Sequence, residues 1–281
     1  MSESGFAEVP GGRLYYEAQG AGPPLLLLHG GLGNLRMWDV QAAPLAERYR
    51  VIRYDRRGFG RSGTEHVAFS DRADALAVLE HAQPGARSCH VIGQSMGGTL
   101  ALDLTLDRPD AVSSLTLVAA GASGLEAELP DGVTPAPFEE MQRLWETKAW
   151  DRLADLETQV WVDGWGQPPS RVDPAVRSRV HDWILTTYQA ENEEGEPQPL
   201  DPPAAGRLGE VRAPTLVMVG GVDEPAGVIN GRTIAARIEG ARLVEFPTAA
   251  HMIQLEEPER FIRVVMGFLA EVDSARGSPA T

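Results

Sequence analysis

A serine flanked by glycines is the first group in the sequence whose type and spacing suit chemistry. Residues 93–98 read Gly-Gln-Ser-Met-Gly-Gly and place Ser95 between an apolar run that ends at Ile92 and a helical run that begins at Thr99. A tight turn from a strand into a helix projects a serine hydroxyl above a sheet, and glycines permit the crowding in such a turn. The pattern predicts that Ser95 is a nucleophile rather than part of a plain glycine-rich turn.

A serine hydroxyl becomes a good nucleophile only when a base removes its proton. Among 6 histidines, His251 lies in a loop between the last predicted strand and the closing helix, where it can reach the ends of the strands. His29 precedes a glycine-rich loop, and we expect its ring to hydrogen-bond to the backbone there. Packing or solvated roles are expected for the others, which are His66, His81, His90 and His181. His251 is therefore the predicted general base.

The imidazole needs a carboxylate that fixes its tautomer and stabilises the imidazolium. Asp223 comes just after the predicted strand 215–219, at the carboxyl end of the strand, as this role requires. Its neighbour Glu224 is the competing candidate, and a plain acidic turn is the alternative without chemistry.

Acyl transfer builds negative charge on a carbonyl oxygen, which two preorganised backbone N–H groups can stabilise. One predicted donor is Met96, the residue after the nucleophile, because it begins a helix whose dipole also favours negative charge. The other is Gly31, in the loop His-Gly-Gly-Leu-Gly at residues 29–33, with its neighbour Leu32 left open. This loop lacks both the spacing of a dinucleotide fingerprint and the Gly-Lys-Ser/Thr ending of a P-loop.

These side chains can meet only if the chain forms a sheet that brings the ends of its strands together. Short apolar runs bounded by glycine, proline or charge are typical of buried parallel strands, and they lie at residues 25–28, 51–54, 90–92, 115–119, 215–219 and 243–246. Helical periodicity is present at 71–81 and 96–106, and a hairpin is predicted over 6–18. The predicted class is α/β, with a mostly parallel central sheet flanked by helices.

The stretch 122–205 differs from the rest of the chain because it has no convincing strand. It carries 17 acidic and 6 basic residues and most of the tryptophans, namely Trp145, Trp150, Trp161, Trp165 and Trp183. Helices are expected at 138–150 and 174–190, with a proline-rich return at 196–203. We therefore predict a core formed by residues 1–121 and 206–281, with 122–205 inserted as a helical cap.

The composition restricts the partners. The chain has 281 residues, 43% of them hydrophobic, with a formal net charge of −15, which opposes binding to nucleic acid and to anionic membranes. The densest apolar run, 25–28, is far shorter than the roughly 20 residues that span a bilayer. We expect a cytoplasmic protein with a small-molecule substrate, and a homo-oligomer is compatible with the sequence.

Two residue types that occur only once exclude further chemistry. Cys89 is the single cysteine, so neither an intrachain disulfide nor the usual thiolate zinc site can form. Lys148 is the single lysine and lies in an ordinary segment, which argues against Schiff-base catalysis. No metal is expected.

Taken together, the motifs resemble those of the α/β-hydrolase superfamily, and specifically its capped serine hydrolases. The order Ser95, Asp223, His251 is that of the family. The resemblance covers residues 6–121 and 206–272 and rests on the oxyanion loop, the turn 55–62, the elbow around Ser95, the Asp223 loop and the segment 251–261. It implies attack by Ser95 on a carbonyl, His251 as base, Asp223 orienting the imidazole, an oxyanion hole at Gly31 and Met96, and no cofactor.

By the same resemblance, the turn 55–62 looks structural. Two small departures, Gln94 and Ala250, stand where the family often has histidine and glycine.

The resemblance leaves the substrate open. Dehalogenases and epoxide hydrolases of the family use aspartate where Ser95 stands, and proline iminopeptidases usually carry tryptophan where Met96 stands. Esterases, enol-lactonases, cofactor-free haloperoxidases with perhydrolase activity and hydrolases of C–C bonds resemble the core about equally, and a receptor-like binding protein is the alternative without catalysis. The expected substrate contacts are Leu32, Trp38, Trp145, Trp161 and Trp165, although tryptophans at helical spacing can equally pack a cap onto a core.

Overall fold

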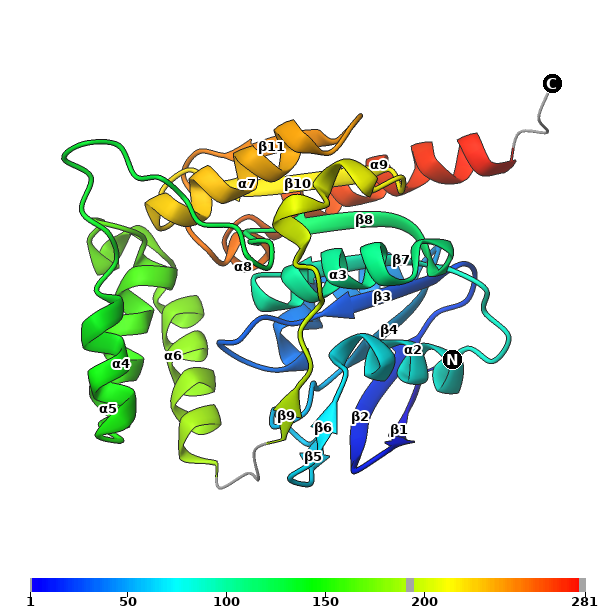
Figure 1. Cartoon of the computed structure of the whole chain (residues 1–281), viewed down its shortest axis with the longest axis horizontal. Helices are drawn as coiled ribbons and strands as arrows, with labels where there is room; N and C mark the ends of the chain where they lie inside the picture. Colours follow the sequence, from blue (N-terminus) through cyan, green and yellow to red (C-terminus); the bar gives the residue numbers. More distant parts are fainter. Residues whose placement is uncertain (1, 191–194, 278–281) are drawn as a thin grey trace.

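The computed structural model describes residues 2–190 and 195–277, and within them nine strands form one sheet (Figure 1). The order across the sheet is β1-β2-β4-β3-β7-β8-β10-β11, with β5 beside β2. The neighbours in the run β4-β3-β7-β8-β10-β11 pair in parallel, whereas β2 pairs antiparallel with β1, β4 and β5. The strands of this sheet are β1 (Ser2–Val9), β2 (Gly12–Gln19), β3 (Pro24–Leu28), β4 (Arg50–Tyr54), β5 (Gly63–Thr64), β7 (Cys89–Gln94), β8 (Val112–Val118), β10 (Thr215–Gly220) and β11 (Arg242–Phe246). Two further strands, β6 (Ala68–Phe69) and β9 (Glu196–Pro197), form a separate pair.

Helices cover both faces of the sheet, as an α/β protein requires. They are α1 (Asp39–Leu45), α2 (Asp71–Ala82), α3 (Met96–Asp107), α4 (Phe138–Glu146), α5 (Trp150–Glu157), α6 (Pro174–Gln189), α7 (Pro225–Arg237), α8 (Ile253–Glu256) and α9 (Pro258–Gly277). One apolar cluster joins the sheet to α2, α3 and α7, and a second joins the opposite face to α1 and α9. The predicted class and the six predicted core strands are confirmed.

Strand β3 shows how the apolar pattern builds both layers. Successive side chains of a strand point to opposite faces, and a strand buried on both faces therefore reads as a continuous apolar run. Leu26 and Leu28 enter the cluster under α2 and α3, whereas Leu25 and Leu27 enter the cluster under α1 and α9.

The stretch predicted as a cap carries α4, α5 and α6, which lie together beside the carboxyl ends of the strands (Figure 1). The single helix expected over 138–150 is wrong, because the chain turns between α4 and α5, where Lys148 has φ +53°. A turn of π-helix, Thr158–Asp163, follows α5. The expectation of no strand is also wrong, since β9 pairs with β6; two residues are too few to leave a pattern in sequence.

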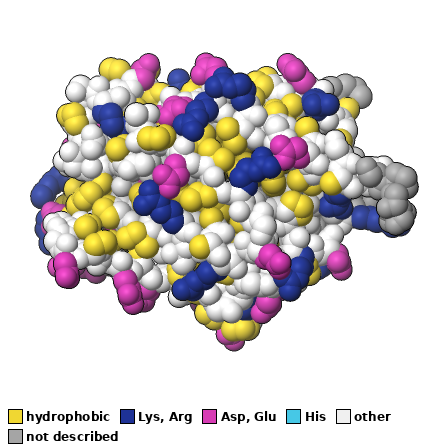
Figure 2. All heavy atoms as spheres, turned by 90° about the horizontal axis from the view of Figure 1, so that it is seen from above, with side chains coloured by type: hydrophobic (Ala, Val, Ile, Leu, Met, Phe, Trp, Pro, Cys, Tyr) yellow, Lys and Arg dark blue, Asp and Glu magenta, His cyan; other side chains and the backbone are white. Residues whose placement is uncertain are grey.

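Opposite charges are interspersed on the surface. On the face seen in Figure 2, basic and acidic side chains lie beside one another between hydrophobic patches. Ion pairs on this part of the fold join α7 to β11 through Arg232 and Glu245, and β11 to α9 through Arg242 and Glu271. Among the described residues, no helix is both long and apolar enough to cross a membrane, and no group of three or more His, Cys, Asp or Glu side chains could hold a metal ion.

Candidate active site

Ser95 occupies the turn between β7 and α3 in a backbone conformation that side chains rarely adopt. Its φ is +53° and its ψ is −121°, and such strain persists only where the surroundings enforce it. The Ser95 N–H donates to the carbonyl of Val118 at 2.9 Å, and the N–H of Gly98 donates to the Ser95 carbonyl at 2.8 Å. A Cβ atom on Gly97 would lie 2.4 Å from the carbonyl oxygen of Leu28, so only glycine fits there. The backbone thus holds Ser95 at the carboxyl end of the central strands.

The structure pairs His251 with Asp223. Nδ1 of His251 donates to Oδ2 of Asp223 at 2.8 Å, and both side chains are buried. Because Nδ1 carries the proton in this pair, Nε2 is the nitrogen that remains to accept one. The other oxygen of Asp223 accepts the N–H of Glu224 at 2.7 Å.

Glu224 is occupied elsewhere. Its Oε2 accepts the N–H of Gly227 at 2.9 Å and so caps the first turn of α7. Capping side chains satisfy N–H groups that the helix itself leaves without partners. Of the two candidate carboxylates, Asp223 is therefore the one that faces the imidazole.

Three further contacts fix the His251 loop. Nε2 of Gln94, next to Ser95, donates to the His251 carbonyl at 3.1 Å. The His251 N–H donates to the carbonyl of Trp161 in the cap at 3.2 Å, and the two rings lie 4.9 Å apart. Gln94 therefore joins the turn at Ser95 to the loop that carries His251.

Arg171 of the cap holds the same loop from the other side. Its Nη1 donates to the carbonyl of Thr248 at 2.6 Å and to the carboxylate of Glu256 at 2.5 Å. Glu256 also accepts the N–H of Ala250 at 2.9 Å. Arg171 in addition donates to two carbonyls of the π-helical turn, at 2.5 and 2.6 Å. Burial raises the pKa of Glu256, and the guanidinium opposes that shift. Sequence reasoning missed this clamp, because its members are far apart in the chain.

Gly31, one predicted oxyanion donor, lies against the side chain of Met96, the other. A Cβ atom on Gly31 would be 2.6 Å from Sδ of Met96, and one on Gly30 would be 3.1 Å from Cβ of Ser95. The glycines therefore let the loop after β3 approach the start of α3 closely. Met96 is the first residue of α3, whose N-terminal N–H groups favour negative charge.

His29 braces the oxyanion loop. Its Nδ1 donates to the carbonyl of Gly30 at 2.7 Å, and its Nε2 accepts the N–H of Arg56 at 3.0 Å. Burial lowers the pKa of His29 to about 3, so the ring is neutral and both nitrogens have fixed roles. The expected bond from His29 to the backbone is confirmed.

The turn at residues 55–62 is structural, as predicted. The carboxylate of Asp55 accepts the N–H groups of Leu35 and Arg61, both at 2.8 Å. The hydroxyl of Ser62 donates to the Asp55 carbonyl at 2.6 Å and accepts the N–H of Tyr15 at 2.8 Å. The turn therefore ties the segment after the oxyanion loop to β2.

The predicted substrate contacts separate into different environments. Trp38 was a wrong prediction, because its side chain is fully buried in the core, 6.2 Å from the ring of Phe261. Trp145 is 43% exposed and packs against Trp150 in the cap, with ring centroids 5.3 Å apart. Trp161 lies against His251.

Leu32, Trp165 and Trp183 line the junction between cap and core. Leu32 is buried with Met252, the residue after His251. The Trp165 N–H donates to the carbonyl of Val222, next to the acid, at 2.9 Å. Trp183 of α6 packs on Gly33 of the oxyanion loop, where a Cβ atom would lie 3.2 Å from its ring. Trp183 belongs to the group of cap tryptophans noted in the sequence but is not among the predicted substrate contacts.

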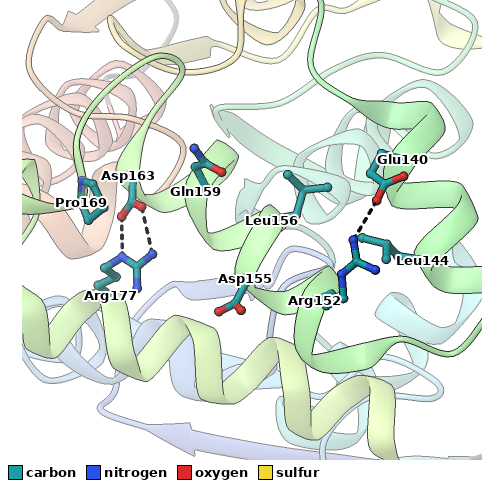
Figure 3. A pocket seen from close by; sticks show the side chains of 9 residues that line it. All are labelled: Glu140, Leu144, Arg152, Asp155, Leu156, Gln159, Asp163, Pro169 and Arg177. Carbon is teal, nitrogen blue, oxygen red and sulfur yellow. Dashed lines mark hydrogen bonds and ion pairs between the residues drawn. The ribbon is translucent and has the colours of Figure 1, made fainter.

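A cavity of about 470 Å³ lies in the cap (Figure 3). Its walls carry an ion pair between Arg177 and Asp163 at 2.7 Å and another between Arg152 and Glu140 at 3.5 Å. The lining residues are Glu140, Leu144, Arg152, Asp155, Leu156, Gln159, Asp163, Pro169 and Arg177. The cavity is therefore a feature of the cap, separate from Ser95, Asp223 and His251.

Known proteins share this architecture. A family model described as alpha/beta hydrolase fold matches residues 23–258. A 2-hydroxymuconate semialdehyde hydrolase of Pseudomonas sp. is 30% identical, with 91% of this chain and 90% of that protein covered. The rhodomycin D methylesterase DnrP of Streptomyces peucetius is 31% identical, with 84% and 87% covered. The solved structure of Est816, titled as an N-acyl homoserine lactone degrading enzyme, is 25% identical with a TM-score of 0.74, covering 94% of this chain and 100% of that one.

Proposed function

The chain belongs to the α/β-hydrolase family, and we propose that it is a serine hydrolase of a small to medium carboxylic ester or lactone, acting through an acyl-enzyme. The observation that carries the proposal is the buried pair of His251 and Asp223, 2.8 Å apart, joined through the side chain of Gln94 to the strained turn that holds Ser95. A nucleophile, a base and an orienting carboxylate in this chain order are the components that acyl transfer needs.

The first half of the reaction forms the acyl-enzyme. Oγ of Ser95 attacks the carbonyl carbon while its proton passes to Nε2 of His251, and Asp223 stabilises the resulting imidazolium. The bond from the carbonyl carbon to the leaving oxygen then breaks, and Nε2 returns the proton to that oxygen. The N–H groups of Gly31 and Met96 hold the negative charge that develops on the carbonyl oxygen.

The second half releases the acid. Water attacks the acyl carbon and gives its proton to Nε2 of His251, after which the bond to Oγ of Ser95 breaks and the serine recovers the proton. All the groups in these steps belong to the chain, so the proposed mechanism uses no metal or organic cofactor.

Hydrolysis of a C–C bond is the second candidate. The observation that favours it is the relative from Pseudomonas sp., named a 2-hydroxymuconate semialdehyde hydrolase. The methylesterase and the lactone-degrading enzyme favour the ester and lactone reading. Perhydrolase activity and receptor-like binding would use the same residues, but no particular contact in the structure favours either of them.

The first experiment is intact mass spectrometry after reaction with a fluorophosphonate probe, on wild type and on Ser95→Ala. One adduct on wild type and none on the variant would support an activated Ser95. Turnover of a panel of esters, lactones and a vinylogous diketone of the kind formed by aromatic ring cleavage then shows which type of bond the enzyme hydrolyses. No adduct and no turnover would contradict the proposal and favour a binding protein.

A further inference from the structure

Glu157 is a buried carboxyl in the cap, without a cationic partner in the part of the chain that the structure describes. It ends α5, and its exposed fraction is 9%. The hydroxyl of Tyr188, on α6, donates to its Oε2 at 2.7 Å. None of the ion pairs formed within residues 2–190 and 195–277 includes Glu157, whereas the buried carboxyls of Asp163 and Glu256 each contact an arginine. A buried carboxylate without a cation is costly, so Glu157 needs an explanation.

The state of Glu157 follows from this environment. Burial raises the pKa of Glu157 to about 7 from 4.5, and the hydroxyl of Tyr188 only partly opposes the shift. A cation placed beside such a group favours the carboxylate and is attracted by it. The carboxyl is therefore ready to pair with a positive charge that comes from outside the protein.

Glu157 is linked to the proposed base through one aromatic ring. It ends α5 and precedes by four residues Trp161, which lies in the π-helical turn that follows. The ring of Trp161 lies 4.9 Å from the ring of His251. The carboxyl thus lies about one helical turn behind the ring that contacts the proposed general base.

Aromatic rings surround this face of the cap. Trp161 contacts Phe138 with ring centroids 6.2 Å apart, and Tyr188 contacts Trp150 at 5.8 Å. The faces of aromatic rings attract cations. The cap also carries 17 acidic and 6 basic residues, which disfavours an anionic substrate.

We propose that Glu157 and Tyr188 form the polar end of the substrate pocket, and that the enzyme prefers esters whose acyl chain ends in a cationic ammonium group. This inference rests on the proposed function, because the acyl group must reach Ser95. The carboxylate would recognise the charge, while Trp161 and Phe138 would contact the chain.

Two isosteric esters test the preference. One is 4-nitrophenyl 5-(trimethylammonio)pentanoate, and the other is 4-nitrophenyl 6,6-dimethylheptanoate, in which carbon replaces the charged nitrogen. We expect wild type to hydrolyse the cationic ester with a kcat/KM at least about tenfold above that of the neutral ester. In Glu157→Gln, the ratio of kcat/KM for the cationic ester to kcat/KM for the neutral ester should fall to about one. Both rates come from the same preparation, so a partly unfolded variant does not alter the ratio.

Asp155→Asn is the matched control. It removes one negative charge from the same helix, but the Asp155 side chain is 74% exposed. Its ratio should stay within about threefold of wild type, because exposed charges are screened. If Asp155→Asn lowers this ratio as much as Glu157→Gln does, the assignment to Glu157 is overturned. A ratio of about one or less in wild type would also overturn it. So would a ratio in Glu157→Gln that equals the wild-type value.

The same experiments test the proposed function independently of the cation preference. Hydrolysis of the neutral ester and labelling by the fluorophosphonate, both abolished by Ser95→Ala, report the serine mechanism whatever the ratio is. Hydrolysis without a cation preference therefore overturns only this inference. Absence of both labelling and hydrolysis overturns the function and the inference together.

Discussion

The backbone at Ser95 stores strain of order 1–3 kcal/mol, because φ is positive at a residue that has a Cβ atom. The crowded glycines around it prevent relaxation, since a side chain on Gly93 would lie 2.2 Å from the carbonyl oxygen of Gly97. The strained turn holds Ser95 at the end of β7, next to Gln94, whose side chain bonds to the carbonyl of His251. Two predictions follow from the roles of single side chains.

Removing the proposed nucleophile or the proposed base should abolish most activity. Ser95→Ala and His251→Ala should each lower kcat by at least about a thousandfold, because triad members act as a unit. Steady-state hydrolysis of an activated ester measures the loss, with circular dichroism as the control for folding. Near-normal turnover in either variant would refute the assignment.

The neighbouring acids should behave differently. Asp223→Asn should lower kcat by about a thousandfold or more at unchanged fold, since the imidazole would lose the partner of its Nδ1. Glu224→Gln should instead cost about 1 kcal/mol of stability through the weakened cap on α7, with a small effect on kcat. Kinetics and urea unfolding of both variants distinguish the roles, and the reverse pattern would make Glu224 the acid.

The cap is tied to both loops that carry the proposed catalytic groups. The Trp165 N–H donates to Val222 beside the acid, and the Trp161 carbonyl accepts from the base loop. Arg171 adds bonds to Thr248 and Glu256. The segment from the π-helical turn to Arg171 is therefore a structural support of the loop that carries His251.

Loss of the Arg171 clamp should impair catalysis without removing any group of the triad. Arg171→Gln should lower kcat about ten- to a hundredfold with a smaller change in KM, because small displacements of a base are costly. The rate of labelling by the fluorophosphonate should fall in parallel, and Arg171→Lys should restore part of it. The exposed Arg179→Gln is the matched control. An unchanged labelling rate in Arg171→Gln would show that the clamp only stabilises the cap.

The molecule as a whole buries two neutral histidines at different places in the sheet. His29 lies at the oxyanion loop, and burial lowers its pKa to about 3. His90, on β7, bonds to Ser114 at 2.8 Å and to Asp273 of α9 at 3.1 Å, and burial also lowers its pKa. A base with a lowered pKa binds fewer protons in the folded state than in the unfolded state. Its contribution is therefore complete above the unfolded value near 6.5 and is lost as the pH falls below it.

The protein should consequently lose stability in mild acid through His29. Between about pH 7.5 and about pH 5, the advantage of wild type over His29→Gln in unfolding free energy should shrink by about 2 kcal/mol. Glutamine can supply a donor and an acceptor but does not titrate in this range. Urea unfolding at the two pH values measures the change, and an advantage that stays constant would mean that His29 is not buried neutral.

Local patterns carried much of the prediction. The alternation of apolar runs with helical segments gave the core strands, and the glycines around Ser95 indicated the elbow, because both depend on neighbours within a few residues. The helix break at Lys148 and the pairing of β9 with β6 left no such pattern. Trp38 was misplaced because an aromatic residue near a catalytic loop can point to either side of it, and here it enters the core.

The sequence by itself determined the α/β class, the family resemblance and the candidates Ser95, Asp223 and His251, since motif order and short-range periodicity are properties of the chain. Tertiary structure alone decided which of two adjacent carboxylates faces His251, because their directions depend on the turn after β10. It also revealed the Arg171 clamp and the buried carboxyl of Glu157, which Tyr188 contacts without any cation from the described residues. The pairing of side chains from distant segments arises only when those segments pack together, and no local pattern encodes it.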